Sequence, residues 1–252
     1  MTPRALAPSS FDAEARRALA TAAALVSHQV AAEWRGSPFH LIALGGRKPD
    51  GLAAEPHDLR PLDPARGEAI LQGRWSFAGE TMSVGPGGDP WDRASPGRAF
   101  AEHLHGMGWL ADLLAHGEKG EREALRLILE WRRVFGRWNA FSWDGAILER
   151  RVFALACGLK RICTRASDVE TAQLADCLAR QARELLNVKL PCGRPAERAA
   201  AAALAGLALG GEAGVKIVAK ALTRLEAALR IEVLADGGHA SRSPQAGLEL
   251  LL

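Results

Sequence analysis

Helical periodicity runs through this sequence from Pro96 to its end, and it restricts the possible fold more than any other feature. Apolar residues recur there at steps of three and four, the spacing that puts them on one face of an α-helix. Because the segments are joined by short connections, they favour packing of neighbours in sequence. We therefore expect an all-α fold with helices over 100–116, 120–135, 142–163, 168–187, 197–209 and 213–234.

Two of these segments, 145–163 and 197–209, are apolar over more than one face. A helix with this pattern is buried on two sides, as in the inner ring of a helical solenoid or toroid. Ser243-Pro244 has the form of an N-cap followed by a first-turn proline, so it predicts one more short helix over 244–252. The sequence stops inside that element, which suggests a fragment of a longer protein; the alternative is a natural short C-terminal helix docked on the core.

The chain divides into three parts. Residues 1–36 are expected to carry an N-terminal helix, and residues 37–97 to form an extended insert rich in Gly and Pro. Trp75 and Phe77 alternate at period two, which predicts short strands or a hairpin over 68–79 and a β-like region near 66–85. Residues 98–252 then form the helical portion.

Composition narrows the classes of partner. The 32 basic and 29 acidic residues give a net charge of +3, too even for a dedicated nucleic-acid binder. No apolar run reaches the roughly 18 residues of a membrane helix, and no export signal is visible, which favours the cytoplasm. The four cysteines form no Cys-x-x-Cys motif, which argues against a zinc site or a redox dithiol. We therefore expect no metal and no cofactor.

One candidate site is the polar loop over 235–244. Gly237-Gly238 permits unusual backbone angles and close approach of a ligand. His239 beside Arg242 suits an anionic substrate, because arginine binds the anion and histidine transfers a proton near neutral pH. Asp236 belongs to the same loop. The alternative is a C-capping Gly-Gly turn in which Asp236 and Ser243 serve only as helix caps.

A second candidate is a histidine beside a flat aromatic side chain. On a continuous helix, His105, Trp109, Asp112 and His116 would share one face. His105 over Trp109 would then offer a platform on which a sugar ring stacks. The alternative is an ordinary helix that packs Trp109 into the core.

A third candidate lies at the turn between two expected helices. Its arginines and tryptophans would line a groove for an acidic chain by ion pairing and stacking. The alternative is a set of helix-terminal arginines with core tryptophans. The residues concerned are Trp131, Arg132, Arg133, Arg137, Trp138, Asn139, Trp143 and Asp144.

Three stretches taken in order resemble the heparinase II/III family of bacterial proteins: 71–79 (LQGRWSFAG), 104–110 (LHGMGWL) and 234–244 (LADGGHASRSP). The resemblance implies an incomplete N-terminal α/α toroid, truncated here before a C-terminal β-sandwich domain. It also implies a polysaccharide lyase that performs β-elimination on acidic glycans containing uronic acid. Relatives of this kind are often periplasmic, so the compartment stays open.

The resemblance implies roles for individual residues. His239 is the expected catalytic group, and the expected substrate-binding residues are Arg242, Asp236, His105, Trp109, Trp143 and Asn139. The family tyrosine corresponds to Ala246, and the chain contains no tyrosine. Enzymatic activity of this chain alone is therefore open, and a non-catalytic acidic-glycan-binding or helical interaction module is the alternative. A glycoside hydrolase using Asp144 and Asp236 is a further one.

Overall fold

The structure, a computed structural model, describes residues 21, 26–27, 29–187 and 194–243, so the predicted helix over 244–252 lies outside the described residues. The chain separates into two compact units, residues 1–43 and 44–252. In the first unit, the described residues from 21 to 36 are helical, and α2 (Pro38–Ala43) follows. The predicted N-terminal helix is thus seen only in its described part, where Val26, Val30 and Trp34 are exposed.

The second unit contains a short helix and a hairpin before its main helices. The helix α3 (Pro64–Leu71) begins where the Asp63 side chain accepts the Arg66 backbone N–H, with Pro64 in the first turn. The strands β1 (Arg74–Phe77) and β2 (Glu80–Ser83) pair antiparallel, with Trp75 opposite Met82. The predicted β-like region near 66–85 therefore contains a hairpin, but the hairpin spans 74–83 rather than 68–79, and residues 68–71 belong to α3.

The region expected as one helix over 100–116 is two helices. The first, α4 (Arg98–Gly106), ends where Met107 takes a left-handed backbone conformation with φ 55°. The second, α5 (Leu110–Leu114), starts after Trp109, whose indole N–H donates to the Leu104 carbonyl at 3.0 Å. A left-handed residue cannot continue a helix, so the change of direction at Met107 overrides the helical spacing of the apolar residues.

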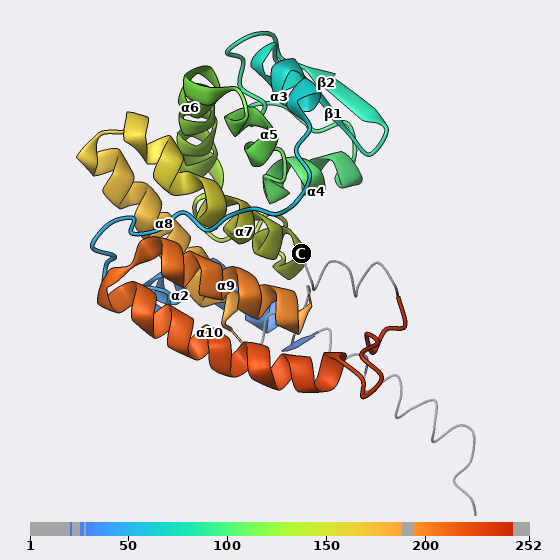
Figure 1. Cartoon of the computed structure of the whole chain (residues 1–252), viewed down its shortest axis with the longest axis vertical. Helices are drawn as coiled ribbons and strands as arrows, with labels where there is room; N and C mark the ends of the chain where they lie inside the picture. The colour runs from blue at the N-terminus through green and yellow to red at the C-terminus, as the bar shows by residue number, and fades with distance from the viewer. Residues whose placement is uncertain (1–20, 22–25, 28, 188–193, 244–252) are drawn as a thin grey trace, which may run out of the picture. The chain divides into compact units, whose positions relative to one another are not determined.

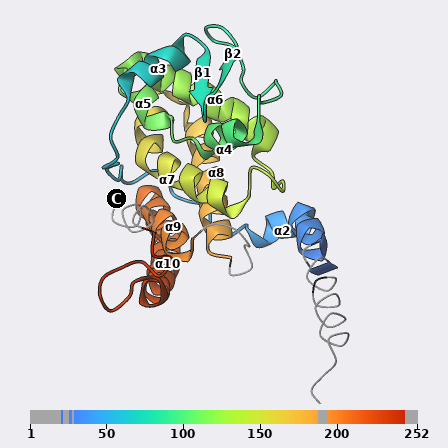
Figure 2. The ribbon, with the colours of Figure 1, turned by 90° about the vertical axis from the view of Figure 1, so that its right-hand side faces the viewer.

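Five of the expected helices form close to their predicted ranges. These are α6 (Gly117–Phe135), α7 (Gly145–Ile162, followed by the 3-10 turn Cys163–Arg165), α8 (Asp168–Leu185), α9 (Pro195–Leu209) and α10 (Gly211–Glu232). The helix α8 starts with a capping box between Ser167 and Glu170. Figures 1 and 2 show α3, the hairpin and α5 at one end of this unit, with α9 and α10 side by side at the other.

The helix α7 occupies the centre of the second unit. It packs against α4, α5, α6, α8 and α9, and its buried residues cover more than one face. The expectation of a helix buried on two sides is therefore confirmed for α7, as is the all-α fold class. None of the helices in the described residues has the length and apolar content that crossing a bilayer requires.

An extended segment over 44–62 crosses α7 and α8 in Figure 1. Ala53 donates its backbone N–H to the Ala208 carbonyl at 2.7 Å, and its own carbonyl accepts from Lys160 Nζ at 2.7 Å. Arg183 donates to the Leu44 carbonyl at 3.1 Å. This segment is thus held by side-chain donors and one helix-end carbonyl rather than by a sheet.

Candidate functional site

The loop that follows α10 is organised by its own backbone. Val233 and His239 form an isolated antiparallel bridge, and the Ala240 N–H donates to the Glu232 carbonyl at 2.7 Å. Gly237 has φ +80°, a conformation that glycine adopts readily. The Asp236 carboxylate accepts the Gly238 N–H at 2.9 Å. Asp236 therefore shapes the turn, as the capping alternative expects.

His239 lies inside this loop, with 8% of its side chain exposed. Its Nδ1 accepts the Ser241 backbone N–H at 3.1 Å, which places the ring proton of a neutral imidazole on Nε2. Nε2 lies 3.6 Å from Glu232 Oε2, while Glu232 Oε1 accepts the Ala196 N–H at 3.3 Å. The imidazole is thus directed toward a buried carboxylate of its own chain.

Arg242 behaves differently from His239. It is exposed and has a positive φ of 54°, and its backbone N–H donates to the His239 carbonyl at 2.8 Å. The two residues are close through the backbone, but one side chain is enclosed and the other is exposed to solvent. This arrangement differs from the expected pair of groups presented together to an anionic sugar.

The expected sugar platform lies in the core. Trp109 is 1% exposed, and its ring meets Trp75 edge-on with centroids 5.1 Å apart. Trp143 is 2% exposed and donates its indole N–H to the Phe135 carbonyl at 3.0 Å. Because both rings are enclosed by protein, the predicted stacking role does not fit them, and the alternative of core packing does.

His105 is also enclosed. Its Nδ1 accepts the Trp131 indole N–H at 3.1 Å, and its ring packs edge-on against Phe135 with centroids 4.6 Å apart. Burial, assisted by the nearby Arg151 charge, lowers the pKa of His105 to about 4. The imidazole is therefore neutral near pH 7, and it acts as a hydrogen-bond acceptor inside the core rather than as an orienting group for substrate.

The other residues of that expected face bind α3. Asp112 accepts the Asp63 backbone N–H at 2.7 Å and Arg66 Nε at 2.6 Å. His116 Nε2 lies 2.8 Å from the Pro64 carbonyl. The break at Met107 separates His105 from Asp112 and His116, so these polar groups position α3 instead of sharing one ligand surface.

Asn139 stabilises the turn before α7. Its Oδ1 accepts the Ser142 backbone N–H, and its Nδ2 donates to Ser142 Oγ, both at 2.7 Å. Asp144 then caps α7 by accepting the Ala146 N–H at 3.1 Å. Both side chains of this turn are therefore engaged in local hydrogen bonds.

Arginines at the end of α6 form a cationic hollow of about 260 Å³ with α8, which we call the arginine hollow. Among the described residues, Arg132, Arg133 and Arg137 have no ion pair, and Arg180 pairs with Asp176 at 2.7 Å. Nε of Arg180 is buried without a hydrogen-bond acceptor. The other lining residues are Gly136, Gln173 and Cys177.

A buried arginine lies behind the arginine hollow. Arg151 is 0% exposed and donates to Gln181 Oε1 at 2.6 Å, to the Ser142 carbonyl at 2.7 Å and to the His105 carbonyl at 3.1 Å. Gln181 Nε2 in turn donates to Cys177 Sγ at 3.2 Å. Burial lowers the pKa of Arg151, and no carboxylate in the described part of the chain pairs with it.

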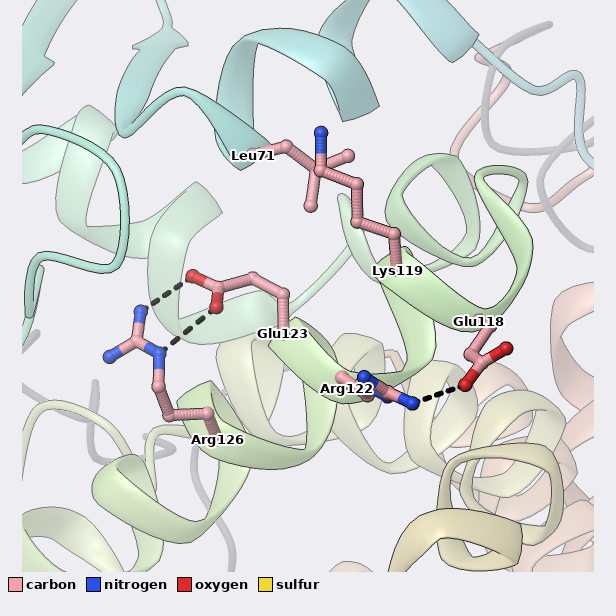
Figure 3. Close-up of a pocket in the computed structure, with 6 residues that line it drawn as sticks. All are labelled: Leu71, Glu118, Lys119, Arg122, Glu123 and Arg126. Atoms are coloured by element: carbon pink, nitrogen blue, oxygen red, sulfur yellow. Dashed lines mark hydrogen bonds and ion pairs between the residues drawn. The ribbon is translucent and has the colours of Figure 1, made fainter.

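A second hollow, of about 640 Å³, lies beside the first half of α6 and is called the paired hollow here. Figure 3 shows that its arginines are each joined to a glutamate: Arg126 to Glu123, and Arg122 to Glu118. Arg126 also bonds Glu130 at 2.8 Å and the Gly88 carbonyl at 3.0 Å. These carboxylates raise the pKa of Arg126 and neutralise most of the local charge.

A third hollow, of about 390 Å³, lies between the extended segment and α5 and α7. It contains His57, Asp58 and Cys157, a set of residue types that also occurs in nucleophilic sites. Burial raises the pKa of the Cys157 thiol to about 12. The thiol stays protonated near neutral pH and is a poor nucleophile. No group of three or more His, Cys, Asp or Glu in the described residues is arranged to hold a metal ion.

Sequence reasoning identified three of the arginines but missed Arg180 and Arg151. Arg180 belongs to a different helix, and no local pattern connects it to Arg137. The sequence does hold one indication of Arg151, because it is a charged residue within the apolar helical segment 145–163. Such a residue is either exposed or buried and hydrogen-bonded.

Comparisons with known proteins give one relative by sequence and two similar solved structures. No protein-family model matches the chain. The FtsZ-localized protein C of Caulobacter vibrioides (strain NA1000 / CB15N) is 52% identical over 219 residues, which is 87% of this chain. The chain spans 38% of that relative's length.

Solved structures of heparan sulfate lyase HepC from Pedobacter heparinus are similar in fold. A mutant form gives a TM-score of 0.56 at 15% identity, covering 96% of this chain and 45% of that one. A second structure gives 0.55 at 16% identity, covering 81% and 40%. This chain therefore has a predominantly helical fold similar to the α/α toroid of heparinase-like lyases.

Proposed function

We propose that this chain is a helical interaction module that localises with FtsZ and does not catalyse β-elimination. The 52% identity to FtsZ-localized protein C over 87% of the chain carries this proposal. Because this identity covers most of the chain, we expect the two proteins to share binding surfaces. The likeness to the lyase, at 15% identity, reaches only the fold.

The chemistry of the described residues supports a non-catalytic role. A β-elimination needs a base, a group that neutralises the substrate carboxylate, and an acid for the leaving oxygen. His239 is 8% exposed and faces Glu232, whereas His105, Trp109 and Trp143 are enclosed in the core. The chain contains no tyrosine to act as base and acid.

Cell imaging tests the proposal. A fluorescent fusion of the chain, and a version of FtsZ-localized protein C in which this chain replaces the matching 219 residues, are expressed with labelled FtsZ. Both fusions are expected to overlap with FtsZ in each cell. A uniform distribution of both fusions, in cells where FtsZ itself stays localised, would refute the proposal.

The second candidate is a polysaccharide lyase acting on acidic glycans with uronic acid, and the HepC-like fold favours it. In this candidate, residues 98–252 supply the toroid portion, and His239 would have to leave Glu232 to meet substrate. A C-terminal β-sandwich domain would supply further groups. Mixing the protein with heparan sulfate and following the ultraviolet band of unsaturated uronate separates the two candidates, since an interaction module produces no such signal.

A further inference from the structure

We infer that the arginine hollow is a docking site for an acidic peptide segment of a protein partner. The inference rests on the proposed function, because it supplies a surface through which such a module binds a protein. The hollow joins the end of α6 to α8 and is lined by Arg132, Arg133, Arg137 and Arg180.

Charge imbalance is the first argument for an anionic ligand. Three of the four guanidinium groups have no ion pair among the described residues, and Asp176 is the carboxylate that pairs with the fourth. Like charges gathered around one concave surface repel each other, and the hollow concentrates their field. A bound anion would offset that repulsion.

The buried groups give a second, independent argument. Nε of Arg180 and Nη2 of Arg151 are both buried, and the described residues supply no hydrogen-bond acceptor to either atom. Buried donors without partners are rare, because such a group loses its hydrogen bonds to water and gains none in exchange. Arg151 donates to Gln181, and Gln181 donates to Cys177, which lines the hollow. The charge of Arg151 has no carboxylate partner among the described residues, so it adds to the positive potential of the hollow.

The chemistry of the lining favours oxyanions, which an acidic peptide supplies as carboxylates. Guanidinium groups bind carboxylate and phosphate oxygens through parallel N–H donors. No aromatic ring lines the hollow, so the described residues offer no surface on which a sugar or a nucleobase stacks. The lining also lacks the apolar side chains that would hold a lipid tail.

Spacing favours an extended peptide over a single anion. Arg132 and Arg133 lie in the last turn of α6, Arg137 follows its C-cap Gly136, and Arg180 comes from α8. The hollow thus presents several separate guanidinium groups rather than one clamp. Alternate side chains of an extended peptide lie on one face about 6.6 Å apart, so a Glu-x-Glu pattern offers more than one carboxylate to these groups at once.

A fluorescein-labelled peptide of alternating Glu and Ser is the direct probe, with a matched peptide carrying Gln for Glu. Fluorescence anisotropy with the whole chain is expected to show binding of the Glu peptide alone, weakening as salt increases. The double variant Arg133→Glu/Arg137→Glu should weaken binding at least tenfold, and the milder Arg133→Gln/Arg137→Gln should weaken it less while preserving the fold.

The control is Lys119→Glu/Arg122→Glu, which makes the same change in net charge on exposed residues of the same helix. Its affinity for the peptide should stay within twofold of the unmodified chain. Equal losses in the two double variants would mean that only overall charge matters, and that result overturns the inference. No loss in the Arg133/Arg137 variants overturns it as well.

Competition distinguishes other sources of anionic groups. Inorganic phosphate, phosphatidylglycerol vesicles and heparan sulfate fragments are each added to the peptide complex. Tighter binding of vesicles or glycan than of peptide, lost in the same arginine variant, would assign the hollow to a membrane or a glycan and overturn the peptide assignment. In cells, absence of the unmodified chain from FtsZ would refute the proposed function, whereas unchanged localisation of the arginine variant would refute only this inference.

Discussion

The two ends of α6 carry arginines in opposite electrostatic settings. In the paired hollow, Arg122 and Arg126 meet glutamates placed three or four residues away on the same helix. In the arginine hollow, Arg132 and Arg133 have no such partner in the described part of the chain. The difference shows that residue type alone does not identify a binding surface, since what counts is whether the fold supplies the counter-charge.

The largest effect on stability is expected from Arg151 of α7, the buried cation behind the arginine hollow. Replacing Arg151 by Met leaves Gln181 Oε1 and two backbone carbonyls without a donor, so the free energy of unfolding should fall by about 3–5 kcal/mol. Urea unfolding followed by circular dichroism measures it. A fall in the free energy of unfolding of less than about 1 kcal/mol would mean that water replaces these hydrogen bonds and that the region around Arg151 is not tightly packed.

The pH dependence of stability should report the same region. The pKa of His105 in the folded chain is lowered to about 4, against about 6.5 when unfolded, so the unfolded state binds more protons between these values. The stabilisation of the folded state that comes from the neutral His105 is complete above pH 6.5 and is lost as pH falls toward 4. It amounts to about 3 kcal/mol at most, from the size of the shift.

Carboxylates also titrate at the lower end of this range, so the measurement compares two proteins. His105→Gln keeps an acceptor for the Trp131 indole but cannot gain a proton. The stability lost between pH 6.5 and 4 should therefore be smaller in this variant than in the unmodified chain. Parallel pH profiles for the two proteins would contradict the buried, neutral assignment of His105.

The same substitution at the two ends of α6 tests the comparison directly. Arg126→Gln removes bonds to Glu123, Glu130 and the Gly88 carbonyl, and should lower stability by about 1–2 kcal/mol. Arg133→Gln removes no ion pair and should change stability by no more than about 0.5 kcal/mol. Equal losses at both positions would show that Arg133 has a counter-charge in solution.

A small but measurable effect is expected at an exposed ion pair. Arg122→Gln breaks the pair with Glu118, but the Arg122 side chain is 70% exposed, so the loss should be about 0.3–0.5 kcal/mol. Thermal unfolding at low and high salt measures it, and the difference from the unmodified chain should shrink as salt screens the pair.

Much of the fold could be predicted because each main helix has a strong apolar stripe and recognisable ends. Ser167 and Glu170, for example, form the capping box that their spacing suggests. The break at Met107 was not predictable, because a left-handed conformation of a residue other than glycine depends on tertiary packing. It also broke the assumed continuous face from His105 to His116.

The candidate site was harder to predict than the fold. Periodicity places Trp109 on one face of an expected helix, but it cannot tell whether that face meets solvent or another helix. At the turn predicted to line a groove for an acidic chain, Trp131 and Trp143 are buried, while Arg132, Arg133 and Arg137 have no ion pair with the described residues. Arg180 lines the same hollow as Arg132 and Arg133 because α8 and the end of α6 both border it, which the sequence pattern does not reveal.

The contacts of Ala53 impose an order on folding during translation. Its hydrogen-bond partners, Lys160 and the Ala208 carbonyl, are made by the ribosome long after residues 44–62 have left the exit tunnel. The nascent chain therefore waits without these partners until the end of α9 has been synthesised, and contacts between such distant residues are slow to form. Chaperones that bind nascent chains would meet this early stretch while it still lacks its final neighbours.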